Sequence, residues 1–87
     1  MKIVAKPIDA AVYFTGKETP RPYRFRCRPE NGEAETVKID RIFQTERTNI
    51  AGAPAIVYRC QSQIGDTMKL YELRYFIREC RWELYKI

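Results

Sequence analysis

Alternation of apolar and polar side chains is the dominant pattern in this chain, and it is clearest in residues Met68 to Ile87. Large apolar residues occupy every second position of two short runs there, namely Tyr71, Leu73, Tyr75, Trp82 and Leu84. A period of two predicts two β-strands that continue to the last residues. Lys69 to Leu84 also fits a helical period in part, but its remaining aromatic residues would then spread around the helix. We therefore favour strands.

The two runs can pair as a hairpin, and charge selects the register. One register places Arg74 opposite Arg81, and like charges directly opposite each other are unfavourable. The other register pairs Tyr75 with Trp82, Leu73 with Leu84, and Arg74 with Glu83. We predict the second register, with a long or distorted turn around Arg78-Glu79, because these residue types are poor turn formers. Trp82 is then expected in the core, since Cys80 and Leu84 share its parity.

A second clear alternation lies nearer the N-terminus. Tyr23, Phe25 and Cys27 alternate with Arg24, Arg26 and Arg28. This pattern predicts a strand with one apolar face and one face of guanidinium groups. Asn31-Gly32 is typical of a hairpin turn, so a third strand should begin near Glu35 and direct Val37 and Ile39 inward. The alternation fails at Arg41, which indicates either a bulge near Asp40 or the end of that strand.

The rest of the chain carries weaker signals. Ala10 to Phe14 is a weak first strand, and Thr45 to Pro54 is expected to be a mobile loop because it is rich in Thr, Asn, Gly and Pro. Ile56, Tyr58 and Cys60 resume an inward face, and Gly65-Asp66 predicts another hairpin turn. Together the patterns predict one all-β domain, residues 1–87, in which a five- to six-stranded antiparallel meander forms a small barrel or a strongly bent sheet.

Charge, cysteine content and the N-terminal segment indicate the cellular compartment. The 87 residues include 16 Lys and Arg against 11 Asp and Glu, a net charge of +5. Three cysteines, Cys27, Cys60 and Cys80, leave one unpaired under any disulfide scheme, so we expect reduced thiols that pack as small apolar groups. Lys6, Pro7 and Asp9 interrupt the N-terminal apolar patch, which argues against a signal peptide or membrane span. We expect a cytoplasmic protein.

Residues for common enzymatic chemistry are missing. The chain has no His, so it lacks an imidazole base or His metal ligand. Its four glycines stand singly and match no phosphate-binding loop. Carboxylate pairs such as Glu33 with Glu35, or Glu72 with Glu83, fit solvated or Arg-paired acids better than a catalytic pair. We expect no enzyme activity, no cofactor and no metal.

The cationic strand is the candidate functional site. Alternate arginines of a strand lie about 6.5 to 7 Å apart, a spacing that suits successive phosphates of a nucleic acid. The candidate nucleic-acid-binding residues are Arg24, Arg26, Arg28, Arg59 and Lys38. Nearby Tyr or Phe rings could stack on bases. The alternative is that these cations pair across strands with Glu33, Glu35 or Asp40 and only keep the outer sheet face hydrated.

The order of segments PYRFRCR, VKIDRIFQ, VYRCQ, YELRY and RWELYKI, which covers Arg21 to Ile87, resembles a family of small bacterial β-domains. Some members are encoded beside, or appended to, accessory proteins of error-prone DNA repair polymerases. The resemblance implies a β-meander and a bacterial cytosolic setting, and it transfers no site residues. In Phe43 to Thr48 this chain lacks the Trp residues that such domains often carry.

Three functional hypotheses follow. The first is a non-catalytic interaction module that contacts protein or nucleic acid. The second narrows the partner to single-stranded nucleic acid or another polyanion, held by the arginine face. The third is a structural subunit or homodimer that pairs through an edge strand, for which the outward parity of Val57 and Ile87 is the only hint.

Overall fold

The computed structural model describes residues 1–17, 19–27 and 35–87, and in these ranges seven strands form one antiparallel sheet. The strands are β1 (Ile3–Tyr13), β2 (Arg21–Cys27), β3 (Glu35–Lys38), β4 (Arg41–Ile50), β5 (Ala53–Ile64), β6 (Thr67–Phe76) and β7 (Arg81–Lys86). The all-β class is confirmed, with more strands than the predicted five to six.

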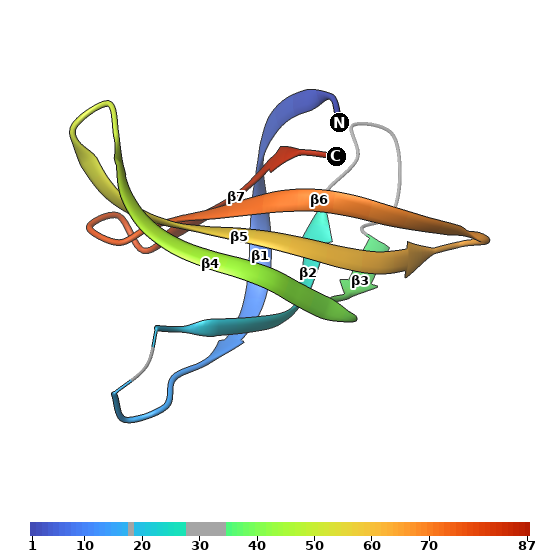
Figure 1. Cartoon of the computed structure of the whole chain (residues 1–87), viewed down its shortest axis with the longest axis horizontal. Helices are drawn as coiled ribbons and strands as arrows, with labels where there is room; N and C mark the ends of the chain where they lie inside the picture. Colours follow the sequence, from blue (N-terminus) through green and yellow to red (C-terminus); the bar gives the residue numbers. More distant parts are fainter. Residues whose placement is uncertain (18, 28–34) are drawn as a thin grey trace.

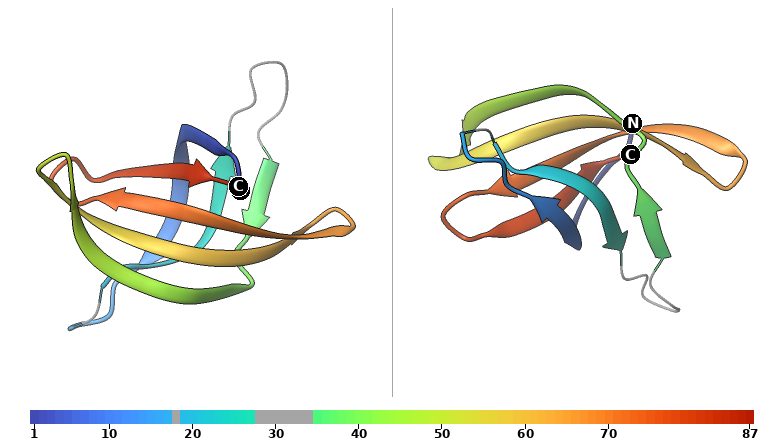
Figure 2. Two further views of the ribbon diagram at one scale, coloured as in Figure 1. Left: turned by 45° about the horizontal axis from the view of Figure 1, so that its top comes forward. Right: turned by 90° about the horizontal axis from the view of Figure 1, so that it is seen from below.

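The sheet curls into a half-barrel, as twisted antiparallel strands tend to do, and its first strand pairs with its last in the middle of the sheet. The spatial order is β3-β2-β1-β7-β6-β5-β4, so β1 joins the N-terminal strands to the C-terminal meander (Figure 1). The two groups face each other, and the chain ends lie side by side (Figure 2). Backbone hydrogen bonds link Lys2 and Ile87 in both directions, at 2.7 and 2.9 Å. Between β3 and β4, the Asp40 N–H donates to the Gln61 carbonyl on β5 at 3.0 Å.

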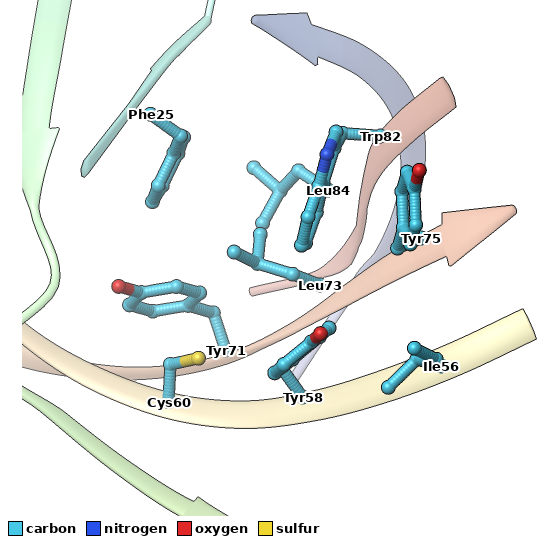
Figure 3. Packing of buried hydrophobic residues seen from close by; sticks show 9 residues of the cluster. All are labelled: Phe25, Ile56, Tyr58, Cys60, Tyr71, Leu73, Tyr75, Trp82 and Leu84. Carbon is cyan, nitrogen blue, oxygen red and sulfur yellow. The ribbon is translucent and has the colours of Figure 1, made fainter. Parts of the chain in front are cut away.

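The core fills the space between these two strand groups. Phe25 on β2 faces a cluster contributed by β5, β6 and β7 (Figure 3), made up of Ile56, Tyr58, Cys60, Tyr71, Leu73, Tyr75, Trp82 and Leu84. The Trp82 ring stacks on Tyr75, with centroids 4.7 Å apart and planes at 25°. Buried hydroxyls are satisfied: Tyr58 donates to the Pro20 carbonyl, and Ser62 Oγ lies 2.6 Å from the Tyr71 hydroxyl. Ser62 also donates to the Lys38 carbonyl at 2.6 Å, which fastens β3 to β5.

The C-terminal hairpin has the predicted register: Tyr75 lies opposite Trp82, Leu73 opposite Leu84, and Arg74 opposite Glu83. Its connection is a four-residue turn between Phe76 and Arg81, as the poor turn chemistry implied. The interpretation of Cys80 as a small apolar residue in a strand is wrong. Cys80 lies exposed in this turn with a φ of 51°, because the strand begins one residue later.

The largest error concerns Thr45 to Pro54, which is not a loop. These residues continue β4, turn at Ala51-Gly52 and enter β5. The apolar pattern is weak because β4 is an edge strand, and an edge strand needs few apolar side chains. The first strand was also predicted too short, since β1 already begins at Ile3.

Of the two alternatives predicted near Asp40, a bulge or the end of the strand, the end of the strand is confirmed. β3 ends at Lys38 and β4 starts at Arg41. Phe25 on β2 lies opposite Val37 on β3, which agrees with a hairpin in this region. The predicted Asn31-Gly32 turn lies outside the described residues. At the other predicted turn, Gly65 has a φ of +62° and connects Ile64 to Thr67, as expected for a two-residue hairpin loop.

Candidate nucleic-acid interface

The first three strands present a cationic surface on the side away from the core. Phe25 is buried opposite Ala10 and Val37, so the residues that alternate with these three point outward. We call this surface the β1–β3 face, and its side chains come from Asp9, Ala11, Tyr13, Tyr23, Arg24, Arg26, Thr36 and Lys38. Three of the predicted site residues, Arg24, Arg26 and Lys38, therefore lie together.

Two of these cations have no acidic partner among the described residues. Arg24 lies opposite Lys38 on one side and Ala11 on the other, and among residues 1–17, 19–27 and 35–87 neither cation has an ion pair. Like charges directly opposite each other are unfavourable in a sheet. A bound phosphate placed between Arg24 and Lys38 would relieve that repulsion.

Arg26 has a weak partner on β1. Its guanidinium lies 3.6 Å from the Asp9 carboxylate, and about half of each side chain is exposed. Such a pair contributes about 0 to 1 kcal/mol, so a phosphate can replace it at little cost. The carboxylates expected to neutralise the arginines do not do so where they are described. Asp40 accepts the Gln63 N–H at 2.8 Å, Glu35 lies opposite Cys27 without an ion pair, and Glu33 is outside the described residues.

A shallow hollow of about 350 Å³ is lined in part by Arg24 and Arg26. It is lined by residues of β1, β2 and β3, namely Asp9, Ala10, Ala11, Arg24, Phe25, Arg26 and Thr36. The small Ala11 side chain leaves this space open beside the guanidinium groups. The hollow therefore offers room for a phosphate group or sugar in contact with both arginines.

Two exposed tyrosines border this cationic surface. The Tyr13 and Tyr23 ring centroids lie 6.0 Å apart, and Arg24 Cζ is 5.5 Å from the Tyr23 centroid. The expectation that Tyr23 points inward with Phe25 is wrong. A register shift pairs Ala11 with Arg24 but Val12 with Pro22, so Tyr23 has no opposite residue on β1. Pro22 takes the buried position instead, and 43% of Tyr23 is exposed.

Arg59 lies elsewhere on the sheet. It is three strands away from β1 in the spatial order, where it contacts Glu72 at 3.7 Å and donates to Gln44 at 2.7 Å. Glu72 is only 3% exposed and also meets Arg74 at 3.1 Å and Lys86 at 4.0 Å. Arg59 thus belongs to a paired charge cluster and not to the β1–β3 face. Arg28, the remaining candidate, lies outside the described residues.

Burial keeps titratable groups of the core protonated at neutral pH. Burial raises the pKa of both Tyr58 and Cys60 to about 12, so each keeps its proton. Burial also raises the pKa of the half-buried Cys27 thiol. No group of three or more His, Cys, Asp or Glu side chains in the described ranges is arranged to hold a metal ion. No helix there is long and apolar enough to cross a bilayer.

No family model, curated protein or solved structure matches this chain. The likeness to β-domains linked to error-prone repair polymerases therefore stays a prediction. Any functional assignment has to be built from the geometry of the β1–β3 face and of the charge cluster around Glu72.

Proposed function

We propose that this protein is a non-catalytic interaction module of the bacterial cytoplasm that binds a nucleic-acid strand by its phosphates on the β1–β3 face. The observation that carries this proposal is the exposed pair of Arg24 and Lys38, which meet no carboxylate in the described part of the chain. The free state of Cys27, Cys60 and Cys80 fits the reducing conditions of that compartment.

The arrangement suits a linear chain of phosphates. Arg24 and Arg26 follow one another along β2 at a spacing of about 6.5 to 7 Å, and Lys38 lies beside Arg24 on the next strand. Guanidinium groups can bind phosphate oxygens in a bidentate manner. Asp9 does not prevent this, because its exposed pair with Arg26 is easily exchanged. Three phosphates can therefore be neutralised within a small area.

The positions of Val57 and Ile87 do not support self-association through an edge strand. Val57 is only 7% exposed and lies on the interior strand β5, and Ile87 already exchanges backbone hydrogen bonds with Lys2. The edge strand β4 carries exposed charges, Glu46 and Arg47 among them, and its register shifts between Ile42 and Gln44. Charges and bulges on edge strands oppose pairing with another chain.

The proposal is tested with a fluorescently labelled 20-nucleotide oligothymidylate, whose anisotropy is followed as the protein is added. Three neutralised phosphates on a single strand predict a slope of log K against log salt of about −2, which weakens binding about 20-fold between 50 and 200 mM salt. The double variant Arg24→Gln/Lys38→Gln should lose at least tenfold in affinity at 50 mM salt and shift the slope to about −0.7.

Two matched variants control for net charge. Arg78 is exposed in the turn between β6 and β7, and Arg59 sits in the Glu72 cluster. Arg78→Gln and Arg59→Gln should each bind within twofold of the unmodified protein. The proposal is wrong if the unmodified protein does not bind at 50 mM salt, or if Arg78→Gln and Arg59→Gln together weaken binding as much as the Arg24/Lys38 double variant.

A further inference from the structure

The two tyrosines of the β1–β3 face have no evident structural task. Tyr13 and Tyr23 are 46% and 43% exposed, whereas Tyr58 and Tyr71 in the core are each 1% exposed. Exposed apolar side chains are common one at a time. Here two aromatic rings lie in contact with each other and next to Arg24, which has no ion pair in the described part of the chain, and aromatic rings beside cations are typical of single-strand binding surfaces.

We propose that Tyr13 and Tyr23 form a stacking platform for the bases of a single strand whose phosphates lie on Arg24, Arg26 and Lys38. This inference rests on the proposed function and adds the class of ligand: an unpaired strand with accessible bases. Duplex DNA satisfies the phosphate contacts but keeps its bases inside the helix. Heparin, a polyanion without bases, can use only the cations.

The geometry allows one nucleic-acid strand to contact both the tyrosine rings and the cations. The two ring planes are inclined by 37°, so the rings do not cover each other as a parallel stack would. Arg24 Cζ lies 5.5 Å from the Tyr23 centroid, and Arg24 also lines the hollow together with Ala11. A phosphate in the hollow and a base on Tyr23 are thus close enough to belong to one nucleotide or to two successive ones.

The bulge in the pairing of β1 and β2 creates this platform. With an unbroken register, Tyr23 would share the inward parity of Phe25 and fill the core. The register shift between Ala11 and Val12 instead buries Pro22 and turns Tyr23 outward to meet Tyr13. Bulges commonly re-aim a side chain next to a functional site.

The test compares Tyr13→Leu/Tyr23→Leu with the ring-preserving Tyr13→Phe/Tyr23→Phe. Phe43→Leu is the matched control, because Phe43 is also 46% exposed and lies 4.7 Å from Arg41 Cζ, but on β4. Each variant is titrated with the labelled oligothymidylate and with a duplex of equal length, and is eluted from heparin by salt. A urea midpoint close to that of the unmodified protein shows that each variant is folded.

The leucine pair should weaken single-strand binding at least tenfold and leave heparin elution and the salt slope unchanged, while the phenylalanine pair and Phe43→Leu bind within twofold of the unmodified protein. Equal affinity of the unmodified protein for single strand and duplex, or full single-strand affinity in the leucine pair, overturns the stacking inference and leaves the phosphate-binding proposal intact. Failure of the unmodified protein to bind either nucleic acid at 50 mM salt overturns the proposed function itself.

Discussion

Replacing Glu72 by Gln should cost this protein a large part of its stability. Glu72 is 3% exposed, yet it lies on the outer side of the sheet, on the face that Arg59 shares. Three cations neutralise it: Arg74 Nε at 3.1 Å, Arg59 Nε at 3.7 Å and Lys86 Nζ at 4.0 Å. Arg74 also covers the Tyr85 ring, with its Cζ 3.2 Å from the centroid.

The expected loss follows from the exposure of each partner. Breaking a buried ion pair by removing one partner costs about 3 to 5 kcal/mol, because the other charge stays buried without compensation. Here the cations keep access to water, with side-chain exposures of 18% for Arg74, 31% for Lys86 and 44% for Arg59. We therefore expect Glu72→Gln to lower the free energy of unfolding by about 2 kcal/mol, and Arg59→Gln by about 0.5 kcal/mol.

Urea denaturation followed by Trp82 fluorescence measures both losses, since Trp82 is the one tryptophan and stacks on Tyr75 in the core. With an m-value of about 1 kcal/mol/M for a small domain, Glu72→Gln should lower the midpoint by about 2 M and Arg59→Gln by about 0.5 M. A loss below about 0.5 kcal/mol for Glu72→Gln, or equal losses for the two variants, would refute this account of the cluster.

Two further predictions concern the hairpin loop at Gly65 and the buried Tyr58 hydroxyl and Cys60 thiol. Gly65→Ala should destabilise the protein by about 1 kcal/mol because Gly65 has a φ of +62°. Gly16→Ala should be neutral within about 0.5 kcal/mol, because the φ of Gly16 lies outside the left-handed region and its new methyl group would meet no atom within 4 Å. Equal urea midpoints for the two variants would contradict this. Because the folded-state pKa values of Tyr58 and Cys60 lie near 12, above the ordinary 10 and 9, the unfolded chain loses these protons first. Stability should thus be full below pH 9 and fall between pH 9 and 12, by up to about 1.4 kcal/mol per pH unit for each group. Tyr58→Phe loses the hydrogen bond to Pro20 and should be about 1 kcal/mol less stable at pH 7. Its free energy of unfolding should nevertheless fall less steeply between pH 10 and 12 than that of the unmodified protein. If urea titrations at pH 7, 10 and 11 give the same pH dependence for both proteins, Tyr58 does not contribute to the loss of stability at high pH.

Strand identity could be predicted where alternation coincides with burial. The pairs Tyr75 with Trp82 and Leu73 with Leu84 followed from side-chain parity and charge, because one face of that hairpin is buried. The same logic failed for β4, whose side chains carry little apolar content because an edge strand is half solvated. It also failed for Val57, since long neighbours on the outer side of the sheet can bury a small residue as effectively as the core does.

The candidate site was predicted in part. Alternation on β2 placed Arg24 and Arg26 on one face, and the hairpin with β3 added Lys38. Two features depend on tertiary contacts that parity does not encode. The bulge that turns Tyr23 outward depends on a register shift between two strands. Arg59 lies away from the site because β7 and β6 stand between β1 and β5 in the sheet order.

The most direct test of the central claim maps the ligand onto the sheet. Amide chemical shifts of the ¹⁵N-labelled protein are recorded as unlabelled oligothymidylate is added at 50 mM salt. Binding to the β1–β3 face predicts the largest changes at Ala11, Arg24 and Lys38, with Val57 and Arg74 on the far strands unchanged. Changes centred on Val57 and Arg74, or an unchanged spectrum, would contradict the assignment of this face as a nucleic-acid interface.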